Sequence, residues 1–258
     1  MNYIGIDIGS TCAKTVVLNK KKELILEFVQ PTGWSSVDTA EEIRQKLELS
    51  GINLSDDSSC CVATGYGRIS VPYADKTVTE ITCHALGAVH LFQHPDLTVI
   101  DIGGQDTKII QIEQGFVKDF IMNDKCAAGT GRFLEVMANT LSLRPNEMFD
   151  LARLGSDTTI SSMCTVFAES EVIGLIGKGE PKENIAYAVV NSTIRKVAAQ
   201  VSRMNGEMSA FCLTGGLCEC DYIREALSKE LGNEVISCPD ARYAGAIGAA
   251  LSAMKIQR

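Results

Sequence analysis

Asp7-Ile8-Gly9-Ser10-Thr11 and Asp101-Ile102-Gly103-Gly104-Gln105-Asp106-Thr107 are the two stretches that decide the fold. In each, an aspartate closes an apolar strand and a glycine follows in a tight turn. A buried Asp is costly unless it meets a cation or strong hydrogen-bond donors. Glycine lets backbone N–H groups approach phosphate oxygens. One such stretch would suit a plain β-turn, but two copies roughly 94 residues apart predict a pair of phosphate-binding loops.

The elements around the two loops follow the same order. In the first half, the pattern predicts strands over 3–9, 14–18 and 24–29, a helix over 36–49 capped by Ser36 or Asp38, and a buried strand over 60–64. In the second half, it predicts strands over 98–103, 107–113 and 116–121, a helix starting near Cys126, and a strand over 208–213. We therefore expect two related α/β halves, with a larger helical insertion in the second.

The boundary between the halves is predicted where Pro95 interrupts a helix. The first domain is expected to cover 1–94 and to be completed by a C-terminal helix over 242–258. The second domain is expected to cover 95–241 and to carry the cysteine-bearing helices.

Composition excludes several classes of function. The chain has 258 residues, a net charge of −8, 45% hydrophobic and 22% charged residues, which is typical of a globular protein. No cluster of Lys and Arg is long enough for a nucleic-acid or anionic-membrane surface. A strand pattern begins at Tyr3, and no apolar run approaches the roughly 20 residues of a membrane span. We expect a cytoplasmic protein that binds neither nucleic acid nor membrane.

Two of the ten cysteines stand where helices are expected to begin. Cys126 opens Cys-Ala-Ala-Gly-Thr-Gly-Arg, and Cys164 opens Cys-Thr-Val-Phe-Ala-Glu-Ser-Glu. Helix N-termini favour anions such as a thiolate-bound cluster. From spacing alone, the pair suits ordinary buried thiols, a zinc bridge, or an iron–sulfur cluster. Cys60, Cys61, Cys218 and Cys220 are expected to be small buried thiols, and whether Cys218 and Cys220 have a role is left open.

The phosphate loops and the cysteine runs together resemble a known family. The paired loops, Leu213-Thr214-Gly215-Gly216 and the small-residue run 244–250 are similar to the actin, sugar kinase and Hsp70 superfamily. Within it, the run from Asp101 to Lys108 and the two cysteine runs resemble the activators of 2-hydroxyacyl-CoA dehydratases, a BadF/BadG/BcrA/BcrD-type ATPase family. Ala63-Thr64-Gly65-Tyr66-Gly67-Arg68 resembles a further signature. The resemblance covers nearly the whole chain and implies two actin- or ribonuclease H-like halves with a nucleotide cleft between them.

The resemblance also implies cofactors and partners. It implies that Cys126 and Cys164 hold one [4Fe-4S] cluster shared across a homodimer, in which the second subunit supplies the other two thiolates. The chain would be an ATPase that passes one low-potential electron to a 2-hydroxyacyl-CoA dehydratase or a double-cubane-cluster protein. A reduced ferredoxin or flavodoxin would supply that electron.

The residues predicted to bind nucleotide follow from the loops. Asp7 and Asp101 should position Mg²⁺, usually through water. Gln105 could orient the attacking water, as a Gln does in some GTPases. The remaining predicted contacts to ATP or ADP are Gly9, Ser10, Thr11, Lys14, Gly103, Gly104, Gly129, Thr130, Gly215 and Gly216.

Two other functions remain open at this point. A small-molecule kinase of the same superfamily would need a catalytic Asp over a substrate pocket and would have no reason for two cysteines at helix starts. A regulatory ATP-binding scaffold could use the same cysteines to hold zinc between two subunits.

Overall fold

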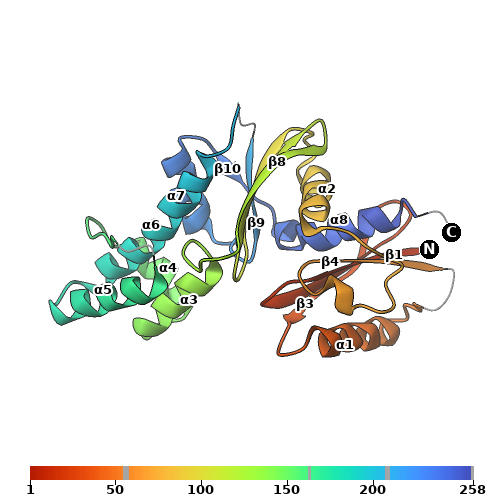
Figure 1. Ribbon diagram of the computed structural model, residues 1–258, viewed down its shortest axis with the longest axis horizontal. Coiled ribbons are helices and arrows are strands. Elements are labelled where there is room, and N and C mark those ends of the chain that lie inside the picture. The colour runs from red at the N-terminus through yellow and green to blue at the C-terminus, as the bar shows by residue number, and fades with distance from the viewer. Residues whose placement is uncertain (55–57, 162–163, 207–209, 257–258) are drawn as a thin grey trace. The chain divides into compact units, whose positions relative to one another are not determined.

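The computed structural model describes residues 1–54, 58–161, 164–206 and 210–256. The chain forms two compact units: one of Met1–Leu97, Ile112–Lys118 and Asp240–Arg258, and one of Thr98–Gln111 and Asp119–Pro239. Figure 1 follows the chain from its red N-terminus to its blue C-terminus. No helix among the described residues is long and apolar enough to span a membrane.

The first unit is built on a five-stranded mixed sheet with the order β3-β2-β1-β4-β5. Its strands are β1 (Asn2–Ile8), β2 (Cys12–Leu18), β3 (Leu24–Pro31), β4 (Ser59–Thr64) and β5 (Lys76–Thr77). The first three strands pair antiparallel, whereas β4 runs parallel to β1. The carboxyl ends of β1 and β4 therefore meet at one edge of the sheet.

Helices cover both faces of this sheet. They are α1 (Ser36–Leu49), α2 (Glu80–Phe92) and α8 (Ala244–Ala253), with short 3₁₀ turns η1 (Arg68–Ser70) and η2 (Pro239–Tyr243). On one face, Ile43 and Leu47 of α1 pack against Ile6 of β1. The opposite face packs against α8 through Val16 of β2 and Ala250. Figure 1 shows α1 on one side of this sheet and α8 on the other.

The start of α1 differs by one residue from the predicted cap. Ser35 is the N-cap, and its hydroxyl accepts a hydrogen bond from the N–H of Asp38 at 3.2 Å. The predictions of Ser36 or Asp38 as the cap were therefore wrong, although the predicted helix 36–49 agrees with α1. A serine cap followed by an acidic first turn stabilises a helix N-terminus.

Small residues let α2 and α8 pack with their backbones in contact. A Cβ added at Gly87 of α2 would lie 1.9 Å from the carbonyl oxygen of Ala244, and one at Gly248 of α8 would lie 1.7 Å from that of Cys83. No side chain fits at these distances. The run of Gly and Ala in the C-terminal helix is thus required by its packing against α2.

The second unit is also built on a five-stranded sheet, with the order β10-β9-β6-β7-β8. Its strands are β6 (Leu97–Ile102), β7 (Thr107–Glu113), β8 (Phe116–Asn123), β9 (Phe211–Gly215) and β10 (Val235–Ile236). β9 pairs parallel with β6 and with β10. A two-residue turn with positive φ at Gln114 and Gly115 joins β7 to β8, as in a hairpin. The predicted strand 208–213 begins outside the described residues, and the observed strand ends two residues later.

The helices of the second unit include the predicted insertion. They are α3 (Gly131–Thr140), α4 (Pro145–Ala152), α5 (Thr165–Gly177), α6 (Lys182–Val201) and α7 (Asp221–Leu231). The prediction of a helix start near Cys126 was wrong, because α3 begins at Gly131 after its N-cap Thr130. Gly129 has φ +86°, which ends any helical conformation before the cap. Cys126 therefore lies in a loop.

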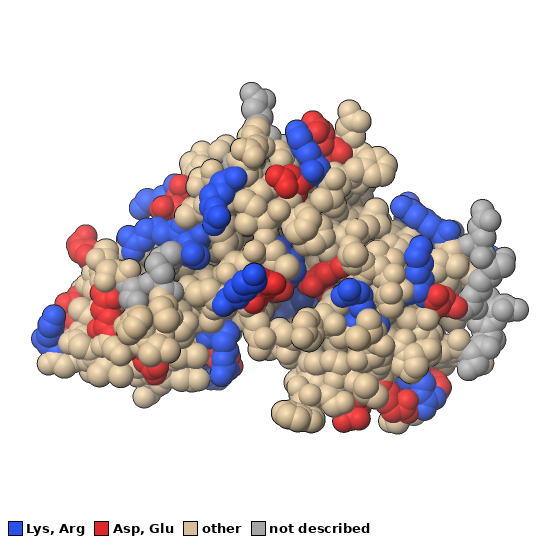
Figure 2. Space-filling model, in the orientation of Figure 1, with Lys and Arg blue, Asp and Glu red and all other residues tan. Residues whose placement is uncertain are grey.

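On the face that Figure 2 shows, the basic and acidic side chains of the coloured residues are scattered among other residues. The two signs of charge alternate there, and neither forms a continuous patch.

Candidate functional site: two phosphate loops and two exposed cysteines

The first loop joins β1 to β2. Asp7, near the end of β1, is 4% exposed, while Ser10 and Thr11 at the tip are exposed. The N–H of Gly9 donates to the carbonyl oxygen of Cys12 at 3.1 Å, which closes the turn. Lys14 is half-buried and lies opposite Asp7 in the β1–β2 register. The loop thus presents two hydroxyl groups and one ammonium group beside a buried carboxylate.

Gly65 supports the first loop from β4. It has φ +82°, and a Cβ at this position would lie 2.4 Å from Oδ1 of Asp7 and 2.5 Å from the carbonyl oxygen of Ile8. Only glycine allows both this backbone conformation and this close approach. Gly65, directly after β4, therefore packs against the Asp7 carboxylate.

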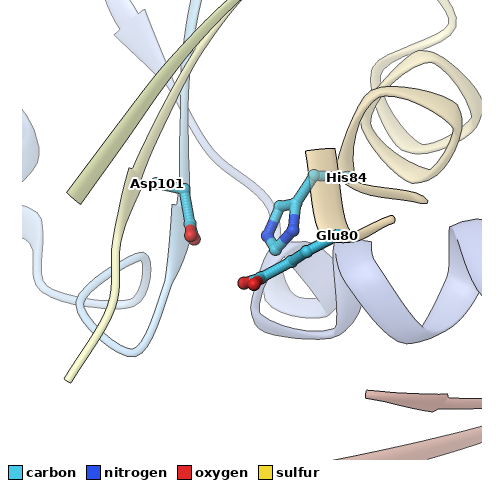
Figure 3. A group of neighbouring side chains, drawn as sticks. All are labelled: Glu80, His84 and Asp101. Atoms are coloured by element: carbon cyan, nitrogen blue, oxygen red, sulfur yellow. The ribbon is translucent and has the colours of Figure 1, made fainter. Parts of the chain in front are cut away.

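The second loop joins β6 to β7 and repeats this construction. Asp101 is 3% exposed at the end of β6, where Figure 3 shows its side chain. The N–H of Gly103 donates to the carbonyl oxygen of Asp106 at 2.9 Å. Gly215 has φ +84°, and a Cβ there would lie 2.6 Å from Oδ1 of Asp101, as at Gly65. The hydroxyl of Thr214 donates to the same Oδ1 at 3.0 Å.

Lys108 is a site residue that the sequence reasoning missed. Its side chain is 2% exposed, and its Nζ lies 3.3 Å from Oδ2 of Asp101 and 2.8 Å from Oδ2 of Asp106. The cation that a buried Asp101 requires is thus supplied by the neighbouring strand. The available signal was the spacing, because Lys108 follows Asp101 by the seven positions that separate Lys14 from Asp7.

The other predicted nucleotide contacts differ in exposure. Gln105 and Gly216 are exposed, whereas Gly129, Thr130 and Gly215 are buried. The hydroxyl of Thr130 donates to the carbonyl oxygen of Ala127 at 2.6 Å. The carbonyl oxygen of Gly129 accepts from the hydroxyl of Thr107, also at 2.6 Å. Gly129 and Thr130 therefore brace the base of the second loop.

Burial separates the cysteines into two groups. All ten lie within the described residues; Cys126 and Cys164 are exposed, and the others are buried or half-buried. Burial raises the pKa of the Cys83 thiol to about 12, and it also raises the pKa of Cys212 and Cys220. These thiols therefore stay protonated near neutral pH. Cys218 is buried and lines an open groove of about 510 Å³ beside Glu219 and Ser237.

The loop that carries Cys126 is fastened to the second phosphate loop. The N–H groups of Gly131 and Arg132, at the start of α3, donate to the carbonyl oxygens of Gly103 and Gly104 at 2.9 and 2.7 Å. Asn123, at the end of β8, donates to the carbonyl oxygen of Cys126 at 2.9 Å. A displacement of the second phosphate loop would therefore move the segment between Cys126 and α3.

Cys164 is the N-cap of α5, as its predicted position at a helix start implied. The Glu171 carboxylate accepts the N–H of Ser161 at 3.0 Å, which ties the preceding segment to the helix. Glu169 accepts a hydrogen bond from Thr140 of α3 at 3.1 Å. The Thr140–Glu169 hydrogen bond thus links α5, which begins after Cys164, to α3, the helix that follows the loop carrying Cys126.

Two polar side chains of the first unit, Glu80 and His84, project from the N-terminal part of α2 (Figure 3). His84 is 2% exposed, and its Cε1 would lie 3.2 Å from a Cβ added at Gly245, the same point that lies 2.5 Å from Oδ2 of Asp7. The imidazole and the Asp7 carboxylate therefore both lie next to Gly245, whose missing side chain leaves space for them.

Several known proteins are similar to this chain in sequence and architecture. The "(R)-2-hydroxyglutaryl-CoA dehydratase activating ATPase" of Acidaminococcus fermentans is 43% identical over 257 residues, covering 98% of this chain and 96% of the relative. The crystal structure of component A of the Acidaminococcus fermentans (R)-2-hydroxyglutaryl-CoA dehydratase superposes with a TM-score of 0.91 at 41% identity, over 99% and 98% of the two chains. The activator of the 2-hydroxyisocaproyl-CoA dehydratase from Clostridium difficile, with bound ADPNP, gives a TM-score of 0.88 at 33% identity, over 100% and 99%.

These likenesses confirm the predicted fold class of two mixed sheets flanked by helices. The model of the BadF/BadG/BcrA/BcrD ATPase family matches residues 4–253. The chain therefore belongs to the BadF/BadG/BcrA/BcrD ATPase family.

Proposed function

We propose that this protein is an ATP-dependent one-electron donor that activates a 2-hydroxyacyl-CoA dehydratase or a related iron–sulfur enzyme. The observation that carries the proposal is the pairing of two exposed cysteines with a phosphate loop that is hydrogen-bonded to the segment carrying one of them. The names of the relatives support the same activity. The protein would then couple the binding and hydrolysis of ATP to electron transfer from a redox centre.

The nucleotide would be held by both loops. In the first loop, the exposed hydroxyls of Ser10 and Thr11 and the half-buried Lys14 suit the β- and γ-phosphates. In the second loop, Gly103 and Gly104 offer backbone groups, and the amide side chain of the exposed Gln105 suits the attacking water. Gly215 and Gly216 would lie against the adenosine. Asp7 and Asp101 would orient Mg²⁺ through water, and the metal would neutralise phosphate charge.

Cys126 and Cys164 fit an iron–sulfur centre shared between two subunits. One chain offers two exposed thiols, and a [4Fe-4S] cluster takes four, so a two-fold homodimer would complete the ligand set. Such a cluster supplies a one-electron store at low potential. Cys164 caps α5, so this thiolate would be stabilised by the N-terminal N–H groups of the helix. Solvent exposure of both thiols would make the centre oxygen-sensitive.

Coupling between nucleotide and cysteines would run through the second loop. The carbonyl oxygens of Gly103 and Gly104 accept the first N–H groups of α3, and Asn123 holds the Cys126 backbone to β8. ATP and ADP would favour different positions of this loop, which is the differential affinity that coupling requires. Hydrolysis would then make electron delivery effectively one-way. A reduced ferredoxin or flavodoxin would act as donor.

Iron and sulfide content tests the proposal. We expect about two irons per chain in anaerobically reconstituted wild-type protein, with broad visible absorption. Cys126→Ser and Cys164→Ser should each abolish both signals. Cys238→Ser is the matched control, because Cys238 is a half-buried thiol of the same unit and should leave the iron content unchanged. Bound zinc without iron would remove the electron-transfer function and leave an ATP-binding dimer.

A further inference from the structure

Lys108, in the second unit, is buried more deeply than is usual for a lysine. Lysine is almost never fully buried unless its ammonium group is paired. The Lys108 side chain is 2% exposed, on a strand whose neighbours Ile109 and Ile110 belong to the apolar core. Its partners are Oδ2 of Asp101 and Oδ2 of Asp106, at 3.3 and 2.8 Å. One ammonium group therefore balances two carboxylates.

The two carboxylates sit at the two ends of one turn. Asp101 closes β6, and the backbone carbonyl of Asp106 accepts the N–H of Gly103. A Cβ at Gly103 would lie only 2.3 Å from Oδ1 of Asp106, so the carboxylate is folded against the loop backbone. Asp101 has a second donor in the Thr214 hydroxyl. The ammonium group thus bridges the start and the end of the loop that presents Gly103, Gly104 and Gln105.

The first loop differs from the second in two respects. Cys12 stands at the position that Asp106 takes in the second loop, and Lys14, the equivalent of Lys108, is half-buried. The two lysines of the duplication therefore have different environments. Lys14 is partly accessible to solvent, whereas Lys108 is enclosed by its own loop.

We propose that Lys108 is a positioning residue that acts as the built-in cation of the second loop. Its ammonium group keeps the turn in the closed conformation that binds the nucleotide. It thereby fixes the positions of the Gly103 and Gly104 carbonyl oxygens, which accept the first N–H groups of α3. The proposal rests on the proposed function, which supplies the nucleotide. Loss of the ammonium charge leaves Asp101 and Asp106 repelling each other, so the loop opens and its hydrogen bonds to α3 weaken.

Lys108→Met tests this role, because Met keeps much of the side chain and removes the charge. The matched control is Lys118→Met, which breaks an exposed pair with Glu113 (3.0 Å) on the neighbouring hairpin. Amide hydrogen exchange without nucleotide should show faster exchange at Gly103, Gly131 and Arg132 in Lys108→Met only. A fluorescent ADP should bind about tenfold more weakly to Lys108→Met and within about twofold of wild type to Lys118→Met.

A cavity variant separates charge from packing. Lys108→Ala removes three methylenes and the ammonium group, which propylammonium replaces closely. We expect propylammonium to restore amide protection and ADP binding, and propanol to fail. Asp106→Asn serves if Lys108→Ala or Lys108→Met does not fold, because it keeps the Asp101–Lys108 pair; it should speed exchange at Gly103 and weaken ADP binding.

Wild-type exchange at Gly103, Gly131 and Arg132 in a folded Lys108→Met, or equal rescue by propanol, would overturn the proposal. For Asp106→Asn, wild-type exchange at Gly103 would do the same. Failure of the wild-type protein to bind ADP would contradict the proposed function instead, since the exchange measurement requires no nucleotide.

Discussion

The two phosphate loops share their construction but differ in how each neutralises its buried aspartate. In both, a glycine with positive φ at the end of the neighbouring strand or directly after it packs against the carboxylate: Gly65 against Asp7, and Gly215 against Asp101. The second loop encloses its lysine between Asp101 and Asp106, whereas Lys14 of the first loop is half-buried. A duplicated motif can thus keep its backbone conformation while its charged side chains take different roles.

The two loops also differ in the elements to which they are hydrogen-bonded. The carbonyl oxygens of Gly9 and Thr11 in the first loop accept hydrogen bonds from Thr32, a residue just after a sheet strand. The equivalent loop in the second unit accepts its hydrogen bonds from the start of α3. The first loop is thus anchored to its own sheet, whereas the second is connected to the segment that carries Cys126.

The largest expected effect comes from neutralising the two lysines in parallel. Lys108→Met should lower the free energy of unfolding by about 3–5 kcal/mol, because it removes the cation that pairs with the buried Asp101 and the half-buried Asp106. Lys14→Met should cost about 1 kcal/mol or less, since water reaches this half-buried site. Urea denaturation followed by circular dichroism measures both. Equal losses of unfolding free energy in the two variants would show that the two lysines contribute equally to stability.

The glycines that support the loops give the next effect. Gly65→Ala and Gly215→Ala should each cost about 2–4 kcal/mol, from backbone strain at positive φ and from the clash with the aspartate. Gly51→Ala and Gly232→Ala are matched controls with positive φ and open space, so they should cost only about 1 kcal/mol. Thermal unfolding of the four variants tests this. If the controls were equally destabilised, the contacts to Asp7 and Asp101 would be unimportant.

Thiol labelling sharpens the contrast between the units. In metal-free protein at pH 8, iodoacetamide should modify Cys126 and Cys164 of the second unit at least about tenfold faster than Cys60, Cys61 and Cys83 of the first. Mass spectrometry of the peptides assigns the sites. Rapid labelling of Cys83 in the folded protein would contradict the burial on which this contrast depends.

The smallest effect is a dependence of stability on alkaline pH. Burial raises the pKa of Cys83 to about 12 from an ordinary value of 9.0, so the thiol stays protonated in the folded state. Its contribution to stability is complete below pH 9 and is lost as the pH rises from 9 toward 12, because only the unfolded thiol ionises over this range. Cys83→Ala should flatten that part of the stability–pH curve. An unchanged slope would show that the loss of stability at alkaline pH comes from other titrating groups.

The sequence predicted the architecture well because its signals were local. Alternating apolar strands that end in Asp-x-Gly, and a helix of regular apolar spacing over 36–49, were sufficient to locate most elements of both sheets. The start of α3 was misplaced because Gly129 and the cap at Thr130 interrupt a run that has helical composition. A positive φ is a property of the folded turn, which composition does not report.

The site was predicted less completely than the fold. The two aspartates and the exposed cysteines carry recognisable local motifs, but the partner of Asp101 depends on which side chain of β7 points inward. Lys108 has the same spacing as Lys14, and only the enclosure by Asp106 separates their roles. Enclosure is a tertiary property, so a charge that sequence would place on the surface was missed.

Hydrogen exchange at the start of α3 tests most directly the claim that the second loop couples nucleotide to Cys126. The amides of Gly131 and Arg132, which donate to Gly103 and Gly104, are compared with ADP and with a non-hydrolysable ATP analogue. The amide of Ile52, which donates to the carbonyl oxygen of Leu47 at the end of α1, serves as the internal control because it lies outside both phosphate loops. We predict that exchange at Gly131 and Arg132 differs by about tenfold or more between the two nucleotides, while exchange at Ile52 changes by less than about twofold. Identical exchange at all three amides would contradict the account.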